Sequence, residues 1–143
     1  MATDENKQIV KDLFVAFGSG DIAVLRDLVA EDVIWHLPGK VPHYSGTYKG
    51  PDRVADFFQG FFANVGVELF QPREFVAEAD RVLVIGSSRG QVKSTGRMFD
   101  NRCVLAFIVR DGKITNFEEY ADTQALAAAH EANSHAAGGL VSI

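Results

Sequence analysis

The chain has 143 residues, which fits one domain, and its composition is ordinary for a globular protein apart from 11 Phe. Its formal net charge is −5 and no run of Lys or Arg occurs. This charge argues against nucleic-acid binding and against attraction to an anionic membrane. No apolar stretch reaches the ~20 residues that cross a bilayer, and the polar N-terminus lacks a signal-peptide pattern. We therefore expect a cytoplasmic protein.

The residues that could bind a metal or form a disulfide are few. A single cysteine, Cys103, excludes an internal disulfide, and its place in an apolar run predicts a buried, inert thiol rather than a reactive one. The four histidines show no zinc-type spacing, and no phosphate-binding loop occurs. We expect no metal site and no cofactor.

The first part of the chain predicts two helices and a strand. Apolar residues at helical spacing predict an amphipathic helix over residues 5–17, which a glycine-rich segment ends. Asp21 is placed to cap a second helix over 22–29, and residues 33–37 predict a strand.

A long loop and a third helix follow. Residues 38–50 predict a loop, and a loop of this length within a compact domain is often functional. Pro51 suits the first position of a helix whose apolar face is unusually bulky. That face is made by Val54, Phe57, Phe58, Phe61, Phe62 and Val65.

The second half of the chain predicts strands. The expected strands are residues 67–77, 82–92, 99–109 and 114–120. A short helix over 123–133 and a mobile tail over 134–143 follow. Three helices before antiparallel strands predict an α+β fold with the helices packed on one face of the sheet. A strongly curved sheet would leave a hollow beside the Phe-rich helix.

Several short motifs occur in an order that is typical of one protein group. They are residues 19–21, 30–35, 38–39, 46–51, 110–114 and 119–122. This order resembles the SnoaL-like group of the nuclear-transport-factor-2-like, or cystatin-like, superfamily. The resemblance covers about residues 6–130 of a chain expected to be a single domain over 1–143.

The resemblance implies a cone-shaped α+β barrel with an apolar pocket at its wide end, which would take a small apolar molecule. Members are commonly homodimers through the outer face of the sheet. The superfamily includes ketosteroid isomerases, limonene-type epoxide hydrolases, polyketide cyclases, dehydratases and non-catalytic binders. A shared fold does not select among these functions.

Residue-by-residue transfer argues against a ketosteroid isomerase. Such enzymes use a Tyr on the first helix, an Asp after the first strand and a protonated Asp on a late strand. These positions fall on Leu13, on Leu37 and within residues 104–106 of this chain, none of which can transfer a proton.

The resemblance to limonene-type epoxide hydrolases is better at the end of the chain. Their late Asp matches Asp122, and their Arg falls on Ser88 or Arg89. Their second Asp and their water-holding Tyr and Asn have no match. Polyketide-cyclase relatives use an Asp in the same late region, which Asp122 would satisfy.

Asp122 is the leading catalytic candidate. A carboxylate in an apolar cavity has a raised pKa and can act as acid and base. The alternative is that Asp122 caps the last helix. Strand periodicity puts Glu118 and Tyr120 on the face of Asp122, so both are candidate substrate contacts. Glu118 pointing to the packed narrow end or to solvent is the other interpretation.

Other side chains are candidates for the pocket wall. Trp35 shares a strand face with Leu37 and could stack on a flat ligand or fill the core. Phe58 and Phe62 lie on the Phe-rich helix beside the expected hollow. His43, Tyr44 and Tyr48 lie on the long loop and could cover the hollow or simply pack locally, and Tyr48 is the best candidate of the three. Arg89 could pair with Asp122 or bind an anionic group, although an exposed strand Arg is commoner.

Three functional hypotheses remain at this point. The first is a small enzyme that acts by proton transfer, as an isomerase, cyclase, dehydratase or epoxide hydrolase, with Asp122 as acid and base. The second is a non-catalytic module that binds a small apolar ligand. The third is a dimeric partner protein whose cavity has no role of its own.

Overall fold

The structure is a computed structural model that describes residues 2–42 and 44–131, so His43 and the predicted tail at 134–143 lie outside the described residues. In chain order the elements are α1 (Ala2–Ser19), α2 (Ile22–Asp27), β1 (Val29–Leu37), β2 (Gly46–Lys49), α3 (Pro51–Asn64), β3 (Val65–Glu78), β4 (Arg81–Val92), β5 (Met98–Arg110), β6 (Lys113–Ala121) and α4 (Thr123–Ala129). None of the helices within these described ranges is both long and apolar enough to cross a membrane.

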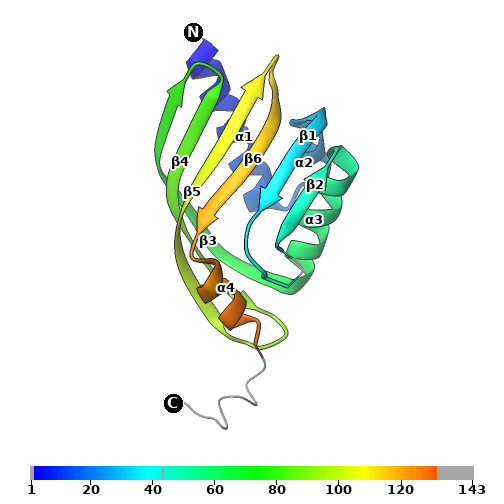
Figure 1. Ribbon diagram of the computed structural model, residues 1–143, viewed down its shortest axis with the longest axis vertical. Helices are drawn as coiled ribbons and strands as arrows, with labels where there is room; N and C mark the ends of the chain where they lie inside the picture. The colour runs from blue at the N-terminus through cyan, green and yellow to red at the C-terminus, as the bar shows by residue number, and fades with distance from the viewer. Residues whose placement is uncertain (1, 43, 132–143) are drawn as a thin grey trace.

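In the described part of the chain, six strands form one sheet in the order β2-β1-β6-β5-β4-β3. Strands β1 and β6 are parallel, and every other neighbouring pair is antiparallel. The sheet curls into a half-barrel, α1 passes behind it, and α2 and α3 lie beside β1 and β2 (Figure 1). The predicted α+β class, with helices packed against a curved sheet, is confirmed.

The boundaries of some elements differ from those predicted. The second helix ends at Asp27, because Val29 already pairs with Ile114 of β6 and so begins β1. The predicted loop over 38–50 contains the short strand β2, which pairs with β1. A strand of this length carries too few alternating residues to be recognised before its partner is known.

Aromatic rings from α1, α3 and the sheet form the core. Phe14 of α1 stacks on Phe70 of β3, with ring centroids 4.8 Å apart. Phe17, one turn further along α1, contacts Phe61 and Phe62 of α3 at 5.8 and 5.4 Å. Aromatic pairs of this kind each stabilise by roughly 0.5–1.5 kcal/mol beyond the area that they bury. The bulky face predicted for the third helix is therefore the one that faces the interior.

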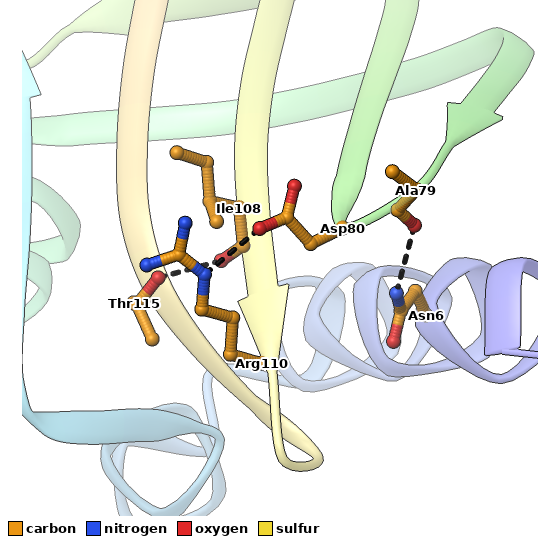
Figure 2. Close-up of polar contacts among 6 residues, drawn as sticks. All are labelled: Asn6, Ala79, Asp80, Ile108, Arg110 and Thr115. Atoms are coloured by element: carbon orange, nitrogen blue, oxygen red, sulfur yellow. Dashed lines mark hydrogen bonds and ion pairs between the residues drawn. The ribbon is translucent and has the colours of Figure 1, made fainter.

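The tip of the β3–β4 hairpin is tied to its surroundings by polar contacts (Figure 2). The Asn6 side chain of α1 donates a hydrogen bond to the Ala79 carbonyl oxygen at 3.4 Å. The Arg110 Nε atom at the end of β5 lies 2.8 Å from a carboxylate oxygen of Asp80. These groups are exposed, so their contribution to stability is small, and their effect is to position the hairpin against α1 and β5.

A bulge in β6 decides which of its side chains enter the interior. On β5 the neighbours Ile108 and Val109 pair with Asn116 and Ile114, so Thr115 is an extra residue on β6. The Thr115 hydroxyl donates a hydrogen bond to the Ile108 carbonyl oxygen at 3.3 Å (Figure 2). Ile114 points inward before the bulge, and the inward positions after it start at Phe117. The bulge thus exchanges the two faces of the strand.

Gly86 allows β3 and β4 to approach closely where the long hairpin bends. Gly86 is opposite Pro72, and the register of the pair shifts between Pro72 and Glu74. A Cβ atom at position 86 would lie 2.5 Å from the backbone oxygen of Gln71, closer than two such atoms can approach. A glycine inside a strand often marks such an approach.

We expect Gly86→Ala to lower the free energy of unfolding by about 1–3 kcal/mol, because the backbone must shift to remove the overlap. Gly66→Ala is the matched control, since the nearest atom to its added Cβ is 3.9 Å away. Urea denaturation of both variants is the measurement. Equal stabilities of the two variants would contradict this account of Gly86.

Candidate functional site

A small cavity lies between α1, α3 and the concave face of the sheet. Its volume is about 90 Å³, and a second space of about 50 Å³ adjoins it through shared wall residues. The wall of the larger space is made by Leu13, Phe14, Phe17, Trp35, Leu37, Tyr44, Phe57, Phe58, Phe61, Phe70, Ser88, Leu105, Phe117 and Glu119. Most of these side chains are aromatic or aliphatic. The two spaces together approach the ~150 Å³ of an apolar cavity that binds benzene.

Glu119 brings a carboxyl group into this apolar wall. Glu119 lies on β6 opposite Leu105 of β5, and only 8% of its surface is exposed. The Tyr44 hydroxyl donates a hydrogen bond to Glu119 Oε1. Both side chains line the larger space, so a bound molecule would meet the pair directly.

The surroundings change the acidity of both groups. Burial raises the pKa of Glu119, and the hydrogen bond from Tyr44 opposes this by lowering it. Burial, followed by the nearby charge of Glu119, raises the pKa of the Tyr44 phenol well above its ordinary value. Tyr44 therefore stays a neutral donor near neutral pH, and Glu119 is the more acidic group of the pair.

The loop after β1 holds Tyr44 in place. The Ser45 hydroxyl donates to the Pro38 carbonyl oxygen at 2.8 Å and accepts from the Val41 backbone nitrogen at 2.7 Å. The Tyr48 hydroxyl of β2 donates to the Tyr44 carbonyl oxygen at 3.0 Å. Side-chain bonds of this kind close a loop onto itself, so Tyr44 is positioned before any ligand arrives.

Trp35 contributes a second kind of polar group. Its ring stacks on Phe117, with centroids 4.0 Å apart and an angle of 17° between the planes. Trp35 is 2% exposed, and its indole nitrogen Nε1 is buried without a hydrogen-bond partner among the described residues.

The structure brings some of the predicted pocket residues together. Trp35, Leu37 and Phe58 line the cavity. Phe62 is absent from the residues that line the two spaces, and it packs behind Phe58 at a centroid distance of 6.2 Å. Tyr48 does not line either space, but its hydroxyl donates a hydrogen bond to the backbone of Tyr44, which does.

Glu118 and Tyr120 lie on the outer face of the sheet, so Tyr120 is not the expected pocket contact and Glu118 takes the solvent-facing placement that was its alternative. Both are exposed, and 56% of the Tyr120 surface is accessible. A hydrogen bond with Glu118 raises the pKa of the Tyr120 phenol, so the two interact with each other outside the cavity. The reason is the bulge at Thr115, which turns Phe117 and Glu119 inward instead.

Arg89 points away from the interior, so it has the exposed placement that is commoner for a strand Arg and is not the candidate pocket contact. It lies opposite Asp100 on the neighbouring strand, and Arg89 Nε is 3.8 Å from a carboxylate oxygen of Asp100. The side chain is 58% exposed. The preceding residue, Ser88, lines both spaces in its place.

Asp122 is the N-cap of α4, the alternative that the sequence left open. One of its carboxylate oxygens accepts a hydrogen bond from the Ala125 backbone nitrogen at 3.0 Å. The buried Asn101 side chain bonds both backbone groups of Asp122, at 3.0 and 3.1 Å. Asp122 does not line either space among the described residues. Its catalytic role stays a prediction.

Cys103 is buried, as predicted, and burial raises the pKa of its thiol to about 12. The charge of Glu119 contributes in the same direction. The thiol therefore stays protonated and unreactive near neutral pH. Within residues 2–42 and 44–131, no group of three or more His, Cys, Asp or Glu side chains could hold a metal ion.

Sequence reasoning missed Glu119 and preferred Tyr48 to Tyr44. The available signal for Glu119 was Phe117, since a large apolar residue two positions away on a strand indicates the buried face. Ile114, with the opposite parity, indicated the other face. No pattern in the sequence announces the bulge between them.

We expect the stability of the protein to depend on pH through Glu119. Because its pKa is raised in the folded state, the contribution of Glu119 to the free energy of unfolding is greatest below the ordinary glutamate value of 4.5 and is lost as the pH rises through the folded-state pKa. Glu119→Gln should remove this fall. Tyr44→Phe should move it to higher pH, since the hydrogen bond that favours the carboxylate is lost.

Urea denaturation at a series of pH values measures these effects, with Glu118→Gln as the control because Glu118 is exposed on the other face. A Glu119→Gln profile that matches the wild type would contradict the burial of a titrating carboxyl group at this position.

Comparison with known proteins agrees with this architecture. The sequence profile of the SnoaL-like domain matches residues 10–117. An uncharacterized protein of Mycobacterium tuberculosis (strain ATCC 25618 / H37Rv) is 30% identical over 126 residues, which are 87% of this chain and 95% of that protein.

Two solved structures show the same fold. An NTF2-like protein from Burkholderia xenovorans LB400 has a TM-score of 0.84 and 45% identity, covering 92% of this chain and 99% of that one. TerC, co-crystallized with polyporic acid, has a TM-score of 0.77 and 26% identity, covering 87% and 97%. The chain therefore belongs to the SnoaL-like domain family and has the NTF2-like fold.

Proposed function

We propose that the protein is a small-molecule enzyme that binds an apolar molecule in the cavity and moves a proton of that molecule with Glu119. The observation that carries this proposal is the buried carboxyl group of Glu119, which borders an apolar cavity and accepts a hydrogen bond from the phenol of Tyr44. This arrangement replaces Asp122, whose carboxylate caps a helix, as the acid and base that best fits the geometry.

The acidity of Glu119 suits this role. Burial raises its pKa toward the range where a carboxyl group can both accept and return a proton, and the Tyr44 hydroxyl stabilises the ionised form. Among the described residues that line the two spaces, Glu119 is the one carboxylic acid. A single group that takes a proton and returns it elsewhere fits isomerisation better than epoxide hydrolysis by two carboxylates.

The second candidate is a non-catalytic module that binds a small apolar ligand. Two observations support it. Most side chains in the wall are aromatic or aliphatic, and Glu119 already accepts a hydrogen bond from Tyr44. The co-crystallization of TerC with polyporic acid is consistent with small-molecule binding in a related chain. The two candidates differ in whether Glu119 exchanges protons with the bound molecule.

Solvent deuterium exchange into a bound ketone tests the enzyme. With acetophenone in D₂O, we expect the wild type to accelerate exchange at the methyl group next to the carbonyl, and Glu119→Gln to lower this rate by roughly a hundredfold or more. Proton nuclear magnetic resonance follows the loss of the methyl signal. Asp122→Asn should retain most of the rate.

Loss of exchange in Asp122→Asn, with full exchange in Glu119→Gln, would return the role to Asp122. Binding of acetophenone without accelerated exchange would favour the non-catalytic module.

A homodimer through the outer face of the sheet is part of the same proposal. Ile85, Val104 and Tyr120 lie opposite one another across β4, β5 and β6 on that face, and Ile85 and Tyr120 are 38% and 56% exposed. An apolar row on an open sheet face is typical of an interaction surface. The occupant that we propose is a second copy of this chain.

We expect the wild type to sediment as a dimer and Ile85→Lys to sediment as a monomer, because a buried unpaired charge opposes the contact. Analytical ultracentrifugation measures this, with Val15→Lys as the control, since Val15 is 72% exposed on α1. A monomeric wild type would contradict the dimer.

A further inference from the structure

The indole nitrogen of Trp35 is a hydrogen-bond donor that the protein itself leaves unused. We propose that Trp35 Nε1 donates its hydrogen bond to an oxygen atom of the cavity's ligand, and that the ligand class is a small one-ring compound with a carbonyl group. This inference rests on the proposed function of the cavity. It adds the polar group by which that cavity recognises its ligand.

The first argument is the cost of the unused donor. Native proteins pair nearly all of their buried donors, because an unpaired one loses its bond to water and gains nothing in return. Among the described residues, Trp35 Nε1 is the one buried side-chain nitrogen or oxygen atom without a partner. Trp35 also lines the larger space. An acceptor on a bound molecule would remove this cost.

The second argument is that the indole ring is held in place. It stacks on Phe117 on one side and meets Phe58 edge to face at a centroid distance of 5.5 Å. Phe107 packs against it at 6.4 Å. A ring confined by three others keeps its orientation, so the donor needs no rearrangement to bind an acceptor.

The third argument is the position of Trp35 relative to Glu119. Trp35 pairs with Phe117 in the parallel β1–β6 ladder, and Glu119 is two residues further along β6 on the same face. Both groups line the larger space. If the carbonyl oxygen of a ligand accepts a hydrogen bond from Trp35, the carbon atom next to that carbonyl group would therefore lie near the carboxyl group of Glu119.

This arrangement has a chemical consequence. When Glu119 removes a proton from the carbon next to a carbonyl group, negative charge develops on the carbonyl oxygen. A fixed N–H donor aimed at that oxygen stabilises the charge. The Tyr44 hydroxyl already donates to Glu119, so Trp35 and Ser88 are the remaining side-chain donors among the described residues that line the larger space.

Two probes of matched shape separate the donor from the cavity. Acetophenone carries a carbonyl oxygen where α-methylstyrene carries a methylene group, so both fill the same space and only the ketone accepts a hydrogen bond. We expect the wild type to bind acetophenone about tenfold more tightly, the usual effect of one hydrogen bond. Trp35→Phe should abolish this preference and bind α-methylstyrene no more weakly. Ser88→Ala and Glu119→Gln should keep the preference.

A second measurement does not depend on a variant. Trp35 is the one tryptophan of the sequence, so its indole N–H gives a single ¹⁵N–¹H signal. That proton should move downfield when acetophenone binds and stay nearly unchanged with α-methylstyrene.

The outcomes separate this inference from the function on which it rests. Equal affinity of the wild type for the two probes, or a preference that Ser88→Ala removes and Trp35→Phe keeps, overturns the role of Trp35 while the apolar cavity stands. Failure of both probes to bind the wild type overturns the ligand class and the small-molecule function together.

Discussion

The burial of Glu119 among aromatic rings is the interaction on which the site depends. A carboxyl group loses much of its hydration when it enters such a wall, and its pKa rises as a result. The Tyr44 hydroxyl returns part of the lost stabilisation through one hydrogen bond. A carboxylate held in this way is poorly stabilised by its surroundings, which is the property that a proton-transfer group needs.

The fold positions this pair through three separate devices. The bulge at Thr115 turns Glu119 to the concave side of the sheet, and the Ser45 bonds close the loop that carries Tyr44. Gly86 lets the β3–β4 hairpin bend. The sheet then curls around α1 and α3 (Figure 1), and their rings fill most, but not all, of the interior.

Helix α4 and its C-cap contribute Leu126 and His130 to the wall of the smaller space, but the carboxylate of Asp122, which precedes the helix, lines neither space. Asp122 begins α4, and Asn101 holds its backbone through two hydrogen bonds. Near the turn between β4 and β5, the Thr95 hydroxyl donates a hydrogen bond to the Ala129 carbonyl oxygen at 2.6 Å. The Arg97 guanidinium donates to the Ala128 carbonyl oxygen at 3.5 Å. An aspartate at the end of a strand can either cap the next helix or act as an acid in a pocket. Here one carboxylate oxygen of Asp122 accepts a hydrogen bond from the backbone of α4.

The fold class and most of the elements were predictable from the sequence, because apolar periodicity and turn residues act over a few neighbouring positions. The bulky face of α3 and the inward side of Trp35 and Leu37 followed from the same local rule. Which side chains of β6 point inward could not be predicted in this way. One extra residue in a strand reverses the face of every side chain after it, and the presence of that residue depends on how β5 pairs with β6. The sequence alone therefore determined the α+β architecture and the aromatic interior. Only the tertiary structure decided that Glu119, and not Glu118 or Asp122, borders the cavity, because strand register is set between strands and not within one.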